Sequence, residues 1–153
     1  MKYFLFILSF LFIFPFCIKD FDVIEATSQK WTGGTPDSGK GTNYAVTMLA
    51  KTNNENLQID QLWIGDNYYE VQAYKRTQNR RDTSFVKNDT IFIQANLLFQ
   101  PDQKGVMLEV KNYENIEKPY NYNGEALIGY YLKGKRKYKE IEKLKQLKYI
   151  PYP

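Results

Sequence analysis

The side chains that most often carry out chemistry in proteins are scarce in this sequence. It contains no histidine, which is the commonest general base and metal ligand, and a single cysteine, Cys17. Cys17 lies at the end of an apolar leader, so the rest of the chain has no thiol to act as a nucleophile or to bind zinc. Carboxylates such as Asp60 and Asp66 bracket a predicted turn, and their spacing fits neither a catalytic pair nor a calcium loop. We therefore expect no enzyme activity, no bound metal and no cofactor.

The segment Gly34–Gly41 (GTPDSGKG) approaches a phosphate-binding P-loop. In that motif, glycine amides and a lysine surround the phosphates, and a hydroxyl directly after the lysine holds magnesium at the start of a helix. Here Gly41 follows Lys40, Thr42 comes one place late, and the next segment alternates like a strand. We interpret the segment as a flexible glycine-rich loop.

Basic residues are concentrated near the C-terminal end. Eight basic and two acidic residues lie between 133 and 148, and Lys135, Arg136, Lys137 and Lys139 form the densest group. Such a group can bind a surface polyanion, either anionic lipid headgroups or polysaccharide, by screened attraction. The alternative is an edge strand whose lysines prevent edge-to-edge aggregation. The net charge of the whole chain is only +4, which favours no class of partner and gives no reason to expect nucleic acid.

Tyrosine is the commonest aromatic residue after the leader. Tyr120 and Tyr122 lie near Pro119 in a predicted loop, where a flat ring with a polar tip suits stacking on sugars or packing at a protein interface. The aromatic residues of the predicted hairpin 57–75 are instead expected in the core or in cross-strand pairs. The two loop tyrosines are therefore candidate binding residues.

The first 17 residues are typical of a secretory leader. Lys2 precedes an apolar run that extends to Phe16, and charged residues follow from Lys19. The run is at the lower limit for a membrane-spanning helix, so removal is favoured over retention as an anchor. Cys17 stands where bacterial lipoproteins carry their lipidated cysteine, although Phe16 is bulkier than the residue usual there. We expect an exported protein of the cell envelope, in the periplasm or at the outer membrane, tethered through a lipid on Cys17; plain secretion and an uncleaved anchor are the alternatives.

Residues 18–153 predict one all-β domain. β-Branched and aromatic residues recur in short alternating runs between clusters of Gly, Asn, Asp and Pro. Strands are expected at 21–30, 43–51, 57–64, 67–75, 91–97, 106–110, 126–132 and 135–143. Gly65 and Asp66 allow a tight turn between the third and fourth strands, which should pair antiparallel. This spacing is typical of an immunoglobulin-like antiparallel β-sandwich of about seven or eight strands.

Three stretches are less regular. Irregular connections are expected at 76–89 and at 112–124. The last segment, 135–143, also fits a helix, because Tyr138 and Ile141 share a helical face with Leu144. A strand is favoured because the preceding strand offers a hairpin partner.

Several short motifs resemble those of small exported proteins and lipoproteins of flavobacterial type, most of which have no characterised activity. The motifs are ATSQKW at 26–31, the Gly33-Gly34 and Ser38-Gly39 pairs, GTNY at 41–44 and LWIGD at 62–66. The resemblance covers about half of the chain after the leader and implies an envelope location and a β-sandwich rather than an activity.

The function we expect is that of a non-enzymatic cell-envelope protein with a structural or protein-interaction role, with an envelope protein as partner. The alternative is a module that binds carbohydrate or another polyanion. In either case the expected contact sites are the loop 32–41, Tyr120, Tyr122 and the basic strand. Oligomeric state has no signature in the sequence.

Overall fold

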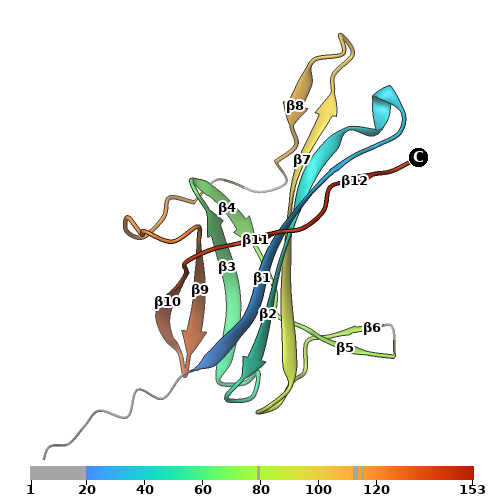
Figure 1. Cartoon of the computed structure of the whole chain (residues 1–153). Coiled ribbons are helices and arrows are strands. Elements are labelled where there is room, and N and C mark those ends of the chain that lie inside the picture. Colours follow the sequence, from blue (N-terminus) through green and yellow to red (C-terminus); the bar gives the residue numbers. More distant parts are fainter. Residues whose placement is uncertain (1–19, 79, 112–113, 115) are drawn as a thin grey trace, which may run out of the picture.

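The computed structural model describes residues 20–78, 80–111, 114 and 116–153. The leader and Cys17 lie outside the described residues, so the lipid anchor stays a prediction. The described residues form two β-sheets packed against each other, with a small third sheet beside them (Figure 1). This architecture confirms the all-β sandwich, and the immunoglobulin-like assignment within that class stays a prediction.

The larger sheet has six strands in the order β11-β1-β2-β7-β8, with β12 also pairing with β1. They are β1 (Phe21–Thr32), β2 (Lys40–Ala50), β7 (Thr90–Pro101), β8 (Met107–Glu109), β11 (Lys145–Gln146) and β12 (Ile150–Pro151). The smaller sheet has the order β10-β9-β3-β4. Its strands are β3 (Leu57–Ile64), β4 (Asn67–Glu70), β9 (Ala126–Leu132) and β10 (Lys135–Ile141). The third sheet is the hairpin β5 (Lys75–Thr77) and β6 (Arg80–Asp82), and a 3-10 turn, η1 (Pro36–Ser38), lies between β1 and β2.

The eight expected strands are present as β1 to β4 and β7 to β10. Alternation predicts them well because most of them bury one face and leave the other in water. The helical alternative for 135–143 is wrong, since β10 pairs along its whole length with β9. The turn between them uses Lys133 and Gly134, which have positive φ angles of 48° and 75°. The turn between β3 and β4 is also as expected, with Gly65 at a φ of 60°.

The stretch 76–89 differs from the irregular connection that was expected. β4 ends at Glu70, earlier than predicted, because Val71–Tyr74 leaves the smaller sheet and crosses to the larger one. There the backbones of Tyr74 and Phe92 exchange hydrogen bonds of 3.0 and 2.8 Å. The chain then forms the hairpin β5–β6. Three-residue strands made of polar residues have no apolar alternation, so the sequence pattern does not reveal them.

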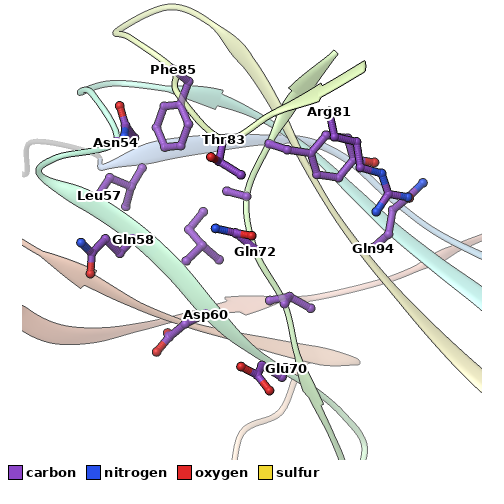
Figure 2. A pocket seen from close by; sticks show the side chains of 14 residues that line it. Asn54, Leu57, Gln58, Asp60, Glu70, Gln72, Arg81, Thr83, Phe85 and Gln94 are labelled. Atoms are coloured by element: carbon purple, nitrogen blue, oxygen red, sulfur yellow. The ribbon is translucent and has the colours of Figure 1, made fainter. Parts of the chain in front are cut away.

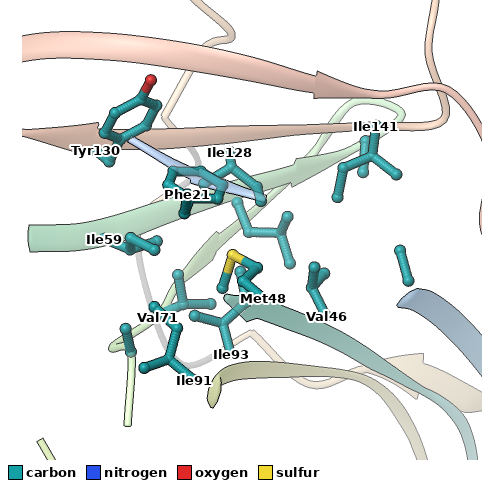
Figure 3. Close-up of a cluster of buried hydrophobic side chains, with 14 of the residues drawn as sticks. Phe21, Val46, Met48, Ile59, Val71, Ile91, Ile93, Ile128, Tyr130 and Ile141 are labelled. Carbon is teal, nitrogen blue, oxygen red and sulfur yellow. The ribbon is translucent and has the colours of Figure 1, made fainter. Parts of the chain in front are cut away.

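Alternate residues of the two facing sheets form one core (Figure 3). Phe21, Met48 and Ile91 of the larger sheet are 0% exposed, as is Ile128 of the smaller sheet. The Phe21 ring meets Tyr130 edge to face, with 5.0 Å between ring centres. Each large apolar side chain buried in this way stabilises the fold by about 1.5–3 kcal/mol. This packing joins the two sheets.

The two sides of the sandwich differ, and we name them by how they are bridged. On the closed side, β10 lies beside the start of β1: the Lys137 Nζ is 3.2 Å from the Asp20 Oδ2, and the Lys139 Nζ donates to the Phe21 carbonyl at 2.7 Å. On the open side, the crossing segment Val71–Tyr74 joins the sheets and the hairpin β5–β6 extends outward (Figure 1). A cleft lies on the open side.

Candidate functional site

A cleft of about 790 Å³ lies on the open side, bordered by β3, the crossing segment, the residues around β6, and β7 (Figure 2). It is lined by Asn54, Leu57, Gln58, Ile59, Asp60, Glu70, Val71, Gln72, Ala73, Tyr74, Arg81, Thr83, Phe85 and Gln94. We call it the amide cleft. Its volume is within the range of small-ligand pockets, about 300–1,000 Å³.

Four carboxamide side chains give the amide cleft its character. Asn54 precedes β3, Gln58 lies on β3, Gln72 lies on the crossing segment and Gln94 lies on β7. Figure 2 shows Gln72 near the middle of the cleft, with the other labelled side chains around it. Gln58 and Gln72 are exposed to solvent. A carboxamide both donates and accepts hydrogen bonds, so this lining matches hydroxyl groups, which also do both.

Asp60 reaches the amide cleft because β3 is irregular there. The pairing of β3 with β9 shifts register between Ile59 and Gln61, and a bulge of this kind re-aims the extra side chain. From β10, Arg136 donates two hydrogen bonds to the Asp60 carboxylate, of 2.5 and 2.8 Å. Its guanidinium carbon lies 3.9 Å from the centre of the Tyr131 ring. The hydrogen bond to Asp60 is the main reason why the pKa of Arg136 is raised.

Arg81 forms the opposite wall of the amide cleft. The Arg81 Nη2 donates to the Gln94 Oε1 at 2.8 Å, which fixes the orientation of that carboxamide. The Arg81 guanidinium also lies 4.7 Å from the centre of the Tyr74 ring, a cation–π contact. Figure 2 shows Arg81 and Gln94 together at one end and Asp60 and Glu70 at another. Both cationic groups near the cleft are therefore already in contact with partners inside the molecule.

The lining of the amide cleft is suited to hydrogen bonding. Where two carboxyl groups act as a catalytic acid and base, an apolar environment keeps one of them protonated so that it can donate to the substrate. Asp60 is tied to Arg136 by two hydrogen bonds, and Glu70 is exposed. Within the described ranges, no cluster of three or more acidic, histidine or cysteine side chains could hold a metal ion. The arrangement is suited to binding a polar ligand.

The basic strand predicted as a polyanion site is β10, an edge strand of the smaller sheet. Lys137 and Lys139 make the contacts of the closed side, and Arg136 holds Asp60. Lys135, at the start of the strand, is exposed. Inward-pointing charges on an edge strand are a known device against edge-to-edge pairing, which agrees with the second interpretation of these lysines.

The two predicted loop tyrosines lie in a segment that covers the outer face of the smaller sheet. Tyr122 packs on a second apolar cluster around Trp63, and its hydroxyl donates to the carbonyl of the β3–β4 turn at 2.8 Å. Tyr120 is 42% exposed and meets Tyr138 edge to face, with 5.9 Å between ring centres. Burial is the main cause that raises the pKa of both tyrosines. Both rings hold this loop in place, and neither lines the amide cleft.

The glycine-rich loop at 32–41 is folded back on itself. The Gly33 amide donates to the Gly39 carbonyl at 2.9 Å, and Ser38 bonds back to Thr35 across η1. A strand, β2, follows Lys40 where a P-loop would require a helix. In the described part of the chain, no helix is long and apolar enough to cross a bilayer.

Sequence patterns do not identify the amide cleft. Its carboxamides come from four segments between residues 54 and 94 that meet only when the chain crosses between the sheets. Glutamine also has no spacing rule that marks a site. Comparison with family models, with curated proteins and with solved structures finds no match for this chain. The fold and the cleft therefore carry the functional argument.

Proposed function

We propose that this chain is a non-enzymatic binding protein of the cell envelope, tethered through Cys17, whose amide cleft takes a neutral, hydroxyl-rich ligand such as a short stretch of glycan. The observation that carries the proposal is the cluster of carboxamides in a cleft of about 790 Å³. Their donors and acceptors match those of sugar hydroxyls.

The charges around the amide cleft support a neutral ligand. Asp60 is neutralised by Arg136, and Arg81 is engaged with Gln94 and the Tyr74 ring. An anionic ligand would have to compete for these groups, whereas a neutral one can use the solvent-exposed carboxamides. Glu70 adds an acceptor at the rim, which also disfavours a polyanion.

The non-enzymatic part of the proposal rests on the residue inventory. The chain has no histidine, and its single cysteine is in the expected leader. The envelope location rests on that leader and on the position of Cys17. The proposal therefore predicts that the isolated protein retains a glycan without cleaving it.

A glycan array probed with residues 18–153 tests the proposal. Wild-type protein should bind a set of neutral glycans, and a Gln58→Ala/Gln72→Ala double variant should lose about tenfold or more in affinity, since each lost hydrogen bond contributes about 0.5–1.5 kcal/mol. Gln103→Ala is the matched control, because Gln103 is an exposed glutamine in the β7–β8 turn. Equal binding by the double variant and the control would refute the assignment of the cleft.

A protein-interaction role is a second candidate, favoured by one observation. β8 is an edge strand of the larger sheet; Val106, just before it, and Leu108, within it, are 54% and 53% exposed. Exposed apolar side chains on a sheet edge are suited to pairing with another chain. Crosslinking in intact source cells should capture a stoichiometric partner with wild-type protein and lose it with Val106→Lys/Leu108→Lys. Capture that is the same for the variant would remove this candidate.

A further inference from the structure

We infer that the outer face of the six-stranded sheet is a second binding surface, on which the flat face of an uncharged polysaccharide chain lies. The inference rests on the proposed function for the chemistry of the ligand, but apart from Gln94 it uses different residues. It extends the ligand from a short stretch of glycan in a cleft to a polymer.

The strand register places nine residues of β1, β2 and β7 in three parallel rows. The rows are Thr27–Ala45–Gln94, Gln29–Asn43–Asn96 and Trp31–Gly41–Leu98. Residues paired across antiparallel strands point to the same face, and the alternate residues Val46 and Met48 point into the core. The three rows therefore face away from the core, and we call this surface the platform.

None of the nine platform residues is charged, and the charged side chains at the border of the platform are already engaged. Lys145, which lies beside Thr27 in the register of β11, contacts Glu25 at 2.8 Å, and Arg81 donates to Gln94 at 2.8 Å. Most of the platform side chains are half-buried or exposed, and Asn96 is the most open of the amide row. A polyanion or a salt-bridged protein partner would have to displace these existing contacts of Arg81 and Lys145. An uncharged partner is the one that this composition fits.

An aromatic ring is held in place at one end of the platform. A Cβ atom added to Gly41 would lie 2.9 Å from the Trp31 Nε1 and 3.0 Å from its Cε2, so the indole lies against the bare backbone of Gly41. Tyr152 of the C-terminal segment meets the Trp31 ring edge to face, with 5.9 Å between ring centres. A fixed, half-exposed indole is suited to stacking on the apolar face of a sugar ring.

The amide row lies within reach of a chain stacked on Trp31. Rows on one face are two residues apart along a strand, about 7 Å, and neighbouring strands are about 4.8 Å apart. Gln29, Asn43 and Asn96 therefore lie beside the indole and across the sheet from one another. The Gln29 Nε2 donates to the Lys148 carbonyl at 2.9 Å, so Asn43 and Asn96 are the main candidates for contact with a ligand. The next row ends at Gln94, which also lines the amide cleft. The platform and the cleft are thus continuous, and one long glycan can contact both.

Affinity electrophoresis through gels that contain a neutral polysaccharide tests the inference. The probes are hydroxyethyl cellulose, xylan, galactomannan and laminarin, with dextran sulfate as a polyanion. The variants are Trp31→Ala and Asn96→Ala on the platform, Gln72→Ala in the cleft, and Tyr149→Ala as a control, because Tyr149 is an aromatic residue that is 50% exposed and lies outside the rows. Asn96 is exposed, so its variant should fold even if Trp31→Ala does not.

We expect at least one neutral polysaccharide to retard the wild-type protein, and Trp31→Ala to weaken that retardation about tenfold, as the loss of a stacked ring implies. Asn96→Ala should weaken it less, and Tyr149→Ala not at all. Retardation that is unchanged in Trp31→Ala and Asn96→Ala but lost in Gln72→Ala would overturn the platform and leave the cleft standing. The reverse pattern would support the platform and refute the cleft. Retardation by dextran sulfate alone, or by none of the probes, would overturn both.

Discussion

The two sides of the sandwich use polar residues in opposite ways. On the closed side, Lys137 and Lys139 reach from β10 to Asp20 and to a backbone carbonyl of β1, so these groups are used within the fold. On the open side, Gln58 and Gln72 line a cleft and are exposed to solvent. One side is bridged by charged groups, and the other carries carboxamides between charged residues at its ends, Asp60 and Glu70 at one and Arg81 at another (Figure 2).

Under the proposed function, this difference explains why the most conspicuous charges in the sequence lie outside the proposed binding site. A buried or partly buried charge, such as that of Asp20 or Lys139, is costly unless it has a partner. A carboxamide can stay in contact with water at little cost and remain available to a ligand. Contacts within the fold account for most of the basic residues of β10. They do not account for the exposed carboxamides of the amide cleft.

The largest effect is expected from weakening the packing at the closed side. Phe21→Ala removes a ring that is 0% exposed and packs against Tyr130, so the free energy of unfolding should fall by about 3–5 kcal/mol. Urea unfolding followed by circular dichroism measures this loss. On the open side, Gln72→Ala should change stability by no more than about 0.5 kcal/mol. Similar losses for both variants would contradict the contrast between the sides.

The next effect concerns the ionic contacts of the closed side. Asp20 is 8% exposed and accepts hydrogen bonds from the Tyr130 hydroxyl at 2.7 Å and from Lys137 at 3.2 Å. Asp20→Ala should therefore cost about 1–3 kcal/mol of unfolding free energy. Asp22→Ala is the matched control: Asp22 pairs with Lys51 nearer the surface, where a pair contributes about 0–1 kcal/mol. Equal urea midpoints for Asp20→Ala and Asp22→Ala would contradict the expected difference in stability.

A smaller effect is expected from pH on the open side. Asp89 accepts from the Val86 amide at 3.0 Å and from Lys75 at 3.1 Å, and these contacts, chiefly the Val86 amide, hold its pKa below the ordinary value of 3.8. Because folding lowers the pKa of Asp89, the ionised carboxylate stabilises the folded state fully when the pH is above the ordinary pKa. This stabilisation is lost as the pH falls through the lower pKa of the folded state. Asp89→Asn should therefore be less stable than wild type at neutral pH. The gap should close in strong acid, and a gap independent of pH would contradict this account.

The smallest effect is expected at Lys135. It is exposed at the start of β10, so Lys135→Ala should change the unfolding free energy by less than about 0.5 kcal/mol. Retention on heparin resin at rising salt measures whether this lysine contributes to polyanion binding. We expect no change, and a clear loss of retention would restore the polyanion interpretation of the basic strand.

Local alternation was sufficient to predict the main strands. β2, for example, buries Val46, Met48 and Ala50 and leaves the residues between them only partly buried, which is the pattern read in the sequence. The turn at Gly65 was equally predictable, because its positive φ favours glycine. The hairpin β5–β6 was not, since its strands are short, polar and stabilised by contacts such as Arg81 with the Tyr74 ring.

The candidate site could not be predicted because it depends on where the chain changes sheets. Val71–Tyr74 looks like the end of a strand in the sequence, and only its departure from β4 creates the cleft. Likewise, nothing in the run 135–139 says that Lys137 and Lys139 reach the other sheet while Arg136 reaches Asp60. Residue types set the available chemistry, and tertiary contacts decided which of them were left for a ligand.

The most direct test of the binding role of the amide cleft is nuclear magnetic resonance of its side-chain amides. The ¹⁵N-labelled protein would be titrated with cello-, xylo- and manno-oligosaccharides and with glycan strands released from peptidoglycan. We predict saturable shifts of the side-chain NH₂ signals of Gln58, Gln72 and Gln94 with at least one of these ligands, and none for Gln103. If these three signals stay fixed while the ligand shifts signals elsewhere, or if none of the ligands shifts them, the cleft is not the binding site.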